Sequence, residues 1–138
     1  MKVTPVKTHK ITIVDKDILA ILDKYVAELP EKSILAISSK IIAICGGRVA
    51  KTGEIDKKEL IKQEADYYLS EKESKYGFIL TIKNNILIPT AGIDESNGNG
   101  FYILWPSNPQ KTANLVKKYL QRRFRLKNVG VIITDSKS

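Results

Sequence analysis

Asp94, Ser96 and Asn97 stand close together in the sequence, directly after two β-prone apolar runs at residues 78–82 and 86–89. Their side chains offer oxygen atoms of the kind that Mg²⁺ and Mn²⁺ prefer. A strand that fixes the backbone, followed by a loop that presents ligands, is a common basis for a binding site. The same residue types also favour an ordinary turn, and taken alone this loop is predicted to be one.

Two further apolar segments end in polar residues of the same kind. One is followed by Ser39 and Lys40, and the other by Asp135 and Ser136. Ligands gather beyond strand ends in sheets that helices cover, so the three polar ends together favour a divalent metal that bridges the phosphates of a nucleotide. For any one of the three alone, a simple strand end is the better interpretation.

Apolar periodicity predicts the elements that position these residues. The predicted strands lie at residues 2–13 (one or two short ones), 33–38, 77–82, 86–88, 101–106 and 129–134. The predicted helices run from an N-cap at Asp15 to just before Pro30, over residues 56–69, and onward from Pro109, while residues 41–45 fit a short helix or a strand. Asn84 and Asn85 predict a hairpin turn. We therefore predict an α+β fold in which residues 1–138 form a single domain, a mixed β-sheet with packed helices.

Composition places the chain among soluble globular proteins, with 138 residues of which 43% are hydrophobic and 28% charged. No apolar run approaches the roughly 20 residues that span a bilayer, and the N-terminus lacks a secretory h-region. A cytoplasmic location and no membrane contact are therefore expected. The single Cys45 and single His9 exclude a disulfide within the chain and a His/Cys metal cluster.

The net charge of +8 predicts an anionic partner, such as a nucleotide, a phosphorylated metabolite, an acidic peptide or a nucleic acid. Residues 111–127 carry seven cations and no acidic residue: Lys111, Lys117, Lys118, Arg122, Arg123, Arg125 and Lys127. A solvated helix face is the commoner meaning of such a run, and the remaining interpretations are a nucleic-acid surface or an electrostatic funnel for an anionic substrate. Nucleic acid is the less favoured partner because no recognised nucleic-acid motif is present.

The order of these segments along the chain resembles that in the coenzyme F420-0:γ-glutamyl ligase family. The similar stretches are Thr4-Pro5-Val6, residues 34–42, Gly47-Arg48-Val49, residues 91–97, residues 106–109 and residues 129–136. Residues 91–97 carry an Ala-Gly-Ile-Asp-x-Ser-Asn motif, which is the most specific of them. The resemblance covers essentially the whole chain, although Trp105 and Asn108 depart from the family pattern around residues 106–109.

Members of that family use GTP with Mg²⁺ or Mn²⁺ to join L-glutamate to a carboxylate of a deazaflavin coenzyme precursor through an acyl phosphate. The resemblance implies metal ligands at Asp94, Asp135 and Ser136, and nucleotide contacts at Ser39, Lys40, Asn97 and residues 7–11, including Thr8 and Ile11. It assigns no residue to catalysis itself. Because the related enzymes are dimers, it also implies a homodimer.

Two features depart from the family pattern. Ile44 stands where the family carries a nucleotide-contacting lysine, and Lys40 is the nearest substitute. The chain ends at Ser138, whereas family members continue past this point, so residues 1–138 are expected to be a fragment, a truncated product or a chain completed by another subunit. The alternative function is a non-catalytic basic module whose residues 111–127 bind nucleic acid or an acidic protein.

Overall fold

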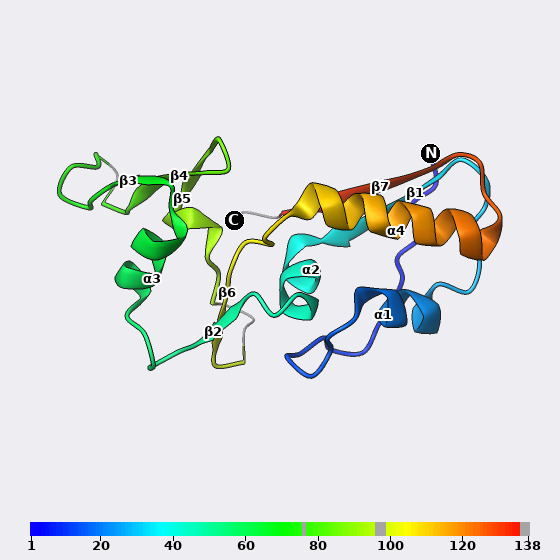
Figure 1. Ribbon diagram of the computed structural model, residues 1–138, viewed down its shortest axis with the longest axis horizontal. Coiled ribbons are helices and arrows are strands. Elements are labelled where there is room, and N and C mark those ends of the chain that lie inside the picture. Colours follow the sequence, from blue (N-terminus) through cyan, green and yellow to red (C-terminus); the bar gives the residue numbers. More distant parts are fainter. Residues whose placement is uncertain (76, 96–98, 136–138) are drawn as a thin grey trace. The chain divides into compact units, whose positions relative to one another are not determined.

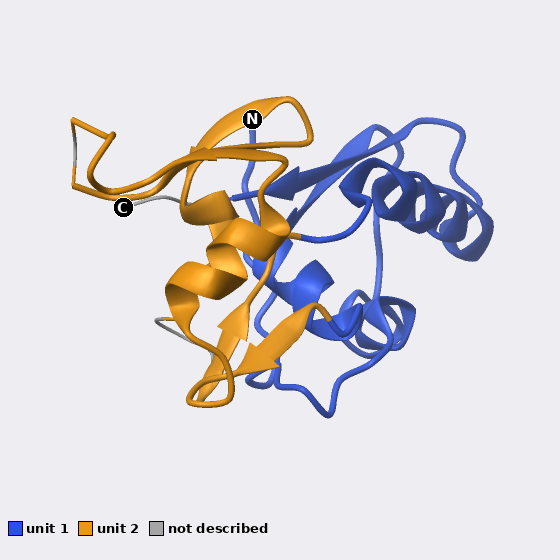
Figure 2. Cartoon of the chain, turned by 60° about the vertical axis from the view of Figure 1, so that its left-hand side comes forward, with its two compact units in different colours: residues 1–47, 106–138 blue, residues 48–105 orange. Residues whose placement is uncertain are grey.

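The computed structural model describes residues 1–75, 77–95 and 99–135. The chain divides into two compact units, coloured separately in Figure 2: unit 1 comprises residues 1–47 and 106–138, and unit 2 comprises residues 48–105. Each unit has a hydrophobic core of its own. The predicted α+β class is confirmed, because helices and strands are both present throughout the described chain.

Unit 1 is built on two parallel strands, β1 (Ser33–Ser38) and β7 (Val129–Thr134), which lie side by side in Figure 1. Both strands were predicted with these bounds. Ser38 lies opposite Thr134 in the register, so the two strands end at the same edge of the sheet. The residues that follow the two strands are therefore brought together, as the sequence predicts for residues beyond strand ends.

Three helices cover one face of this pair: α1 (Ile18–Tyr25), α2 (Ser39–Cys45) and α4 (Pro109–Phe124). The core between these helices and the two strands is formed by the buried side chains of Leu22, Val26, Ile37, Ile42, Val116, Leu120 and Val129. The side chain of Asn108 caps α4, and Pro109 occupies its first turn, where the helix was predicted to begin. The ambiguous segment at residues 41–45 is helical.

Two predictions for unit 1 are wrong. Residues 2–13, all of them described, form no strand, because no described strand pairs with them and an extended segment becomes a strand only when it pairs with another. Helix α1 is capped by Asp17 and not by Asp15, whose carboxylate instead accepts a hydrogen bond from the Thr12 backbone. The helix also ends at Tyr25, well before Pro30.

Unit 2 contains an antiparallel pair, β2 (Val49–Lys51) with β6 (Phe101–Ile103), and one α-helix in its described part, α3 (Lys57–Glu64). A second antiparallel sheet has the order β3 (Tyr67–Leu69), β4 (Leu80–Lys83) and β5 (Ile86–Pro89). Parallel and antiparallel pairing are thus both present, and in the described residues they are divided among three small sheets.

The hairpin between β4 and β5 is confirmed, because Asn84 and Asn85 both adopt left-handed backbone angles, with φ of 50° and 63°. The predicted helix over residues 56–69 is correct only as far as Glu64. Beyond it, residues 67–69 pair with β4, since β-prone tyrosines with an available partner strand favour a sheet over another helical turn. In the described residues, no helix combines the length and apolar character that crossing a bilayer requires.

Candidate functional site

Ser39 and Asp135 meet at the edge of unit 1 where β1 and β7 end. The Ser39 hydroxyl donates a hydrogen bond of 3.2 Å to Oδ1 of Asp135. Ser39 is buried, whereas Asp135 is exposed to solvent. The serine therefore orients a carboxylate that still faces water, an arrangement that suits a metal ligand.

Lys40 lies in the first turn of α2, next to Ser39. The Ser38 hydroxyl caps this helix by accepting a hydrogen bond of 3.3 Å from the Lys40 backbone N–H. Ile44 lies four residues further along α2, so Lys40 and Ile44 share one face of the helix. That Lys40 substitutes for the lysine of the family pattern stays a prediction.

Residues 7–11 are anchored to α1 by the chain's one histidine. The His9 backbone N–H donates to the Tyr25 hydroxyl at 2.9 Å, and its Nε2 lies 2.9 Å from Oδ1 of Asp15. The hydrogen bond from the Thr12 backbone and that from His9 lower the pKa of Asp15. Thr8 and Ile11 are half-buried in this segment, so the structure gives the predicted nucleotide-lining residues a defined place in unit 1.

Asp94 lies in unit 2, where its backbone is fixed on both sides to Ile103 of β6. The Asp94 N–H donates to Ile103 O at 3.0 Å, and the Ile103 N–H donates to Asp94 O at 2.7 Å. Asp94 is half-buried. The prediction that it simply follows a strand end is thus incomplete, because a tight turn separates it from β5 and an isolated bridge pairs it with β6.

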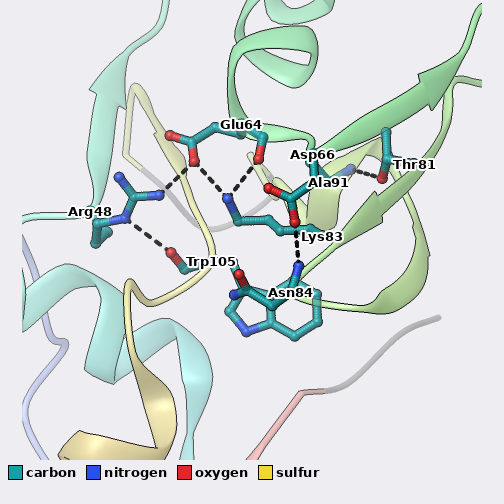
Figure 3. Close-up of polar contacts among 8 residues, drawn as sticks. All are labelled: Arg48, Glu64, Asp66, Thr81, Lys83, Asn84, Ala91 and Trp105. Atoms are coloured by element: carbon teal, nitrogen blue, oxygen red, sulfur yellow. Dashed lines mark hydrogen bonds and ion pairs between the residues drawn. The ribbon is translucent and has the colours of Figure 1, made fainter.

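That turn is η1 (Thr90–Gly92), and all three of its residues have positive φ: 53°, 51° and 74°. The left-handed region costs a residue other than glycine about 1–2 kcal/mol. The buried Ala91 N–H donates to the Thr81 hydroxyl at 2.8 Å (Figure 3). At Gly92, an added Cβ would lie 2.9 Å from Cε3 of Trp105. The turn before Asp94 is therefore held by a hydrogen bond on one residue and by close packing on the next.

Glu64 joins two cations in the interior of unit 2, as Figure 3 shows. Its Oε2 accepts hydrogen bonds from Arg48 at 2.6 Å and from Lys83 at 3.0 Å, and Arg48 Nε donates to the Trp105 carbonyl at 3.1 Å. Burial by itself would raise the pKa of Glu64, but the hydrogen bonds from the two cations outweigh it and lower the pKa. The network ties α3, β4 and the residue just before β2 to Trp105, which lies next to Gly92.

A basic groove of about 580 Å³ runs along α4. Its lining residues are Asn108, Gln110, Lys111, Asn114, Leu115, Lys118 and Arg122. Among the residues that the structure describes, no carboxylate lies within ion-pair distance of its three cations. Arg123 differs from them, because it pairs with Asp23 and donates to the Leu22 carbonyl, and so stabilises the contact between α4 and α1.

The comparison with known families decides the ancestry of the chain. A profile of the family described as F420-0:Gamma-glutamyl ligase matches residues 2–138. The chain belongs to this family. The predicted resemblance is therefore confirmed, and it covers both units.

Three relatives within the family carry the name coenzyme F420:L-glutamate ligase. The protein from Methanopyrus kandleri is 32% identical, with 87% of this chain and 54% of the relative covered. Those from Methanococcus maripaludis and Methanocaldococcus jannaschii are each 28% identical, with 92% and 90% of this chain and 50% and 49% of the relative covered. The chain thus spans about half the length of the relatives it matches.

The ligands expected for this family fit a hard divalent cation. Asp94 and Asp135 supply carboxylates, and Mg²⁺ is commonly held by one or two of these together with water and phosphate oxygens. In the described part of the chain, no group of three or more His, Cys, Asp or Glu side chains is arranged to hold a metal. Asp94 and Asp135 belong to different units and are each described within their own. Ser136 and Asn97 lie outside the described residues.

Sequence reasoning missed Thr81, Glu64 and Lys83, which hold the surroundings of Asp94. A threonine within an apolar strand and a glutamate on a polar helix are ordinary at their positions, so neither gives a local signal. Of the residues in this network, only Arg48, which pairs with Glu64, belongs to a stretch that resembles the family. The contacts of Glu64 with Arg48 and Lys83 span 16 and 19 residues, and they become visible only once the sheets are formed.

Proposed function

We propose that this chain takes part in a GTP- and divalent-metal-dependent ligation that joins L-glutamate to a carboxylate of an F420-0-type acceptor. The observation that carries the proposal is the Ser39–Asp135 hydrogen bond, which sets a solvent-facing carboxylate at the joint end of two parallel strands. Membership of the ligase family and the names of the three relatives support the same reaction class. The whole enzyme's activity is part of this proposal.

The reaction has two displacements. An oxygen of the acceptor carboxylate attacks the γ-phosphorus of GTP, and the bond from that phosphorus to the GDP oxygen breaks, which gives an acyl phosphate. The glutamate amine then attacks the acyl carbon, the bond to the phosphate oxygen breaks, and inorganic phosphate and a proton leave. Both steps concentrate negative charge, so positive groups near the phosphates are the main catalytic requirement.

Asp94 and Asp135 are the proposed metal-binding carboxylates, with Ser136 beside the second. The bound metal would neutralise charge on the triphosphate. Ser39 holds Asp135 in place through its hydroxyl, and Lys40 would bring a cation to the phosphates. Asn97, Thr8 and Ile11 are proposed to contact the nucleotide. Mg²⁺ or Mn²⁺ as the metal, a homodimer and a cytoplasmic location belong to the same proposal.

The test is turnover by the full chain with GTP, MnCl₂, L-glutamate and the acceptor, followed by mass spectrometry of the glutamyl product and assay of GDP. We expect product only when all four are present, and a rate at least about 100-fold lower in Asp94→Asn and in Asp135→Asn. Asp56→Asn and Asp17→Asn are the matched controls, one in each unit, because asparagine still caps α3 and α1. Glutamate-independent GDP release, or no product at all, contradicts the proposal.

A second candidate function rests on the groove along α4, where Lys111, Lys118 and Arg122 face solvent without a carboxylate neighbour in the described chain. Such a groove suits a polyanion, either a nucleic acid or an acidic protein. This function predicts binding that weakens steeply with salt, is lost in the Lys118→Gln/Arg122→Gln variant and is unchanged in Asp94→Asn. Binding that is equal at low and high salt would exclude it.

A further inference from the structure

Thr81 is a buried polar residue at the centre of β4, and it is 1% exposed. Its hydroxyl makes two hydrogen bonds: it donates to the Ile88 carbonyl and accepts from the Ala91 N–H at 2.8 Å. A valine has nearly the same shape and suits a buried strand better, because it has no hydroxyl to satisfy. The hydroxyl therefore links β4 both to β5, through Ile88, and to the turn that follows β5, through Ala91.

The turn needs its hydrogen bond to Thr81 because its backbone angles are unfavourable. Thr90 and Ala91 both stand in the left-handed region, which residues with a Cβ seldom adopt. Ala91 is completely buried, so without the Thr81 hydroxyl its N–H would lose its partner at a site away from water. Strain that neighbouring groups hold in place is typical of segments that position functional side chains.

Little freedom remains between this turn and Asp94. Ala91 is 0% exposed and Ile93 is 6% exposed, so both side chains are packed in the core of unit 2. The Ile93 N–H donates to Thr90 O at 3.0 Å, and Asp94 is then fixed to Ile103 by two backbone hydrogen bonds. A change in the backbone angles at Ala91 would be carried into the direction of the Asp94 carboxylate.

We infer that Thr81 is the positioning residue for Asp94, acting through its hydrogen bond to the turn at Thr90–Gly92. The inference rests on the proposed function, because it takes Asp94 as a metal ligand. Thr81 touches neither metal nor nucleotide in this account. Its hydroxyl fixes the turn, and the turn fixes the carboxylate.

The experiment compares Thr81→Val, which removes the hydroxyl and keeps the shape, with Thr81→Ser, which keeps the hydroxyl. Thr81→Ala serves as a second hydroxyl-free variant, should valine impair folding. Thr112→Val is the matched control, because it also removes a threonine hydroxyl bonded to a backbone carbonyl, but in unit 1. Circular dichroism fixes a temperature at which every variant is folded. Calorimetry then measures Mn²⁺·GTP affinity, and amide hydrogen exchange follows residues 90–94.

We expect Mn²⁺·GTP affinity to fall at least about tenfold in Thr81→Val and Thr81→Ala and to stay within about twofold in Thr81→Ser and Thr112→Val. Amide exchange at residues 90–94 should quicken in the two hydroxyl-free variants alone. If the unmutated chain binds Mn²⁺·GTP and the two hydroxyl-free variants bind it equally well, the proposed role of Thr81 is wrong and the proposed function is unaffected. If the unmutated chain does not bind Mn²⁺·GTP, the proposed function is wrong, and the role of Thr81 in positioning a metal ligand is wrong as well.

Discussion

Asp135 and Asp94 are held by different kinds of structure, although both are proposed metal ligands. Asp135 directly follows a parallel strand, and a hydrogen bond from Ser39 orients it. Asp94 lies behind three left-handed residues and between two backbone hydrogen bonds to Ile103. Ordinary sheet geometry is enough to place Asp135. Asp94, in contrast, follows a turn whose backbone angles are unfavourable and must be stabilised by neighbouring groups. The comparison predicts that the Asp94 region tolerates change less than the Asp135 region.

The largest effect is expected from Gly92→Ala in unit 2. The new Cβ would lie 2.9 Å from a ring carbon of Trp105, at a φ of 74°. Overpacking and left-handed strain together are expected to lower the free energy of unfolding by about 2–4 kcal/mol. The fluorescence of Trp105, the chain's single tryptophan, follows the unfolding of unit 2 in urea.

Gly130→Ala is the matched change in β7, the strand that ends just before Asp135. Its Cβ would lie 3.3 Å from Cγ1 of Ile34, an exposed side chain that can move aside. We expect a change within about 0.5 kcal/mol, followed by far-ultraviolet circular dichroism. If Gly92→Ala were no more destabilising than Gly130→Ala, the contrast between the two regions would be wrong.

The next largest effect is expected from Glu64→Gln, which removes the charge between Arg48 and Lys83. These side chains are less than a third exposed, so the loss should be about 1–3 kcal/mol at neutral pH. The folded-state pKa of Glu64 lies below its ordinary value of 4.5. The stability it supplies is therefore present above pH 4.5 and lost as the pH falls through the folded-state pKa.

Urea unfolding between pH 3 and pH 7, followed by Trp105 fluorescence, measures this effect. The stability of the unmutated chain should fall more steeply below about pH 4.5 than that of Glu64→Gln. Glu59→Gln, an exposed glutamate on the same helix, is the control and should behave as the unmutated chain does. Equal acid sensitivity of Glu64→Gln and the unmutated chain would show that the network does not stabilise unit 2.

A smaller effect on stability is expected from Ser39→Ala. The substitution removes one hydrogen bond to an exposed carboxylate, so the free energy of unfolding of unit 1 should fall by less than about 1 kcal/mol. Mn²⁺·GTP affinity should nevertheless fall about tenfold, because a group that orients a metal ligand affects binding more than folding. A large loss of stability without a change in affinity would make Ser39 a structural residue only.

The smallest effect concerns Cys45 at the end of α2, the helix that begins at Ser39. Burial raises the pKa of its thiol to about 11. At pH 7.5 the thiolate fraction, and with it the rate of alkylation by iodoacetamide, should be about 100-fold below that of an ordinary thiol. Alkylation at the rate of a free thiol would show that α2 opens readily, which would weaken the account of Ser39.

The sequence predicts one of the two regions far better than the other. β1, β7 and the start of α4 follow from apolar runs and from capping residues such as Asn108, which are local signals. The hairpin follows from Asn84 and Asn85. Once these two strands pair in parallel, as they do in the structure, sheet geometry brings Ser39 and Asp135 together.

The Asp94 region could not be predicted in the same way. No local preference places Thr90 and Ala91 in the left-handed region, and the Thr81 hydroxyl that holds the turn is ten residues away. Residues 67–69 also become a strand only because β4 is available to pair with them. The sequence therefore indicates that Asp94 is a candidate ligand, whereas the way it is held is evident only in the folded unit.

Calorimetric titration of GTP into the chain, with and without Mn²⁺, tests the central claim most directly. We expect GTP to bind only when Mn²⁺ is present. Asp94→Asn and Asp135→Asn should each weaken this binding at least about 100-fold. The control variants Asp56→Asn and Asp17→Asn should bind as the unmutated chain does. Equal GTP binding without the metal, or undiminished binding by Asp94→Asn and Asp135→Asn, would contradict the central claim.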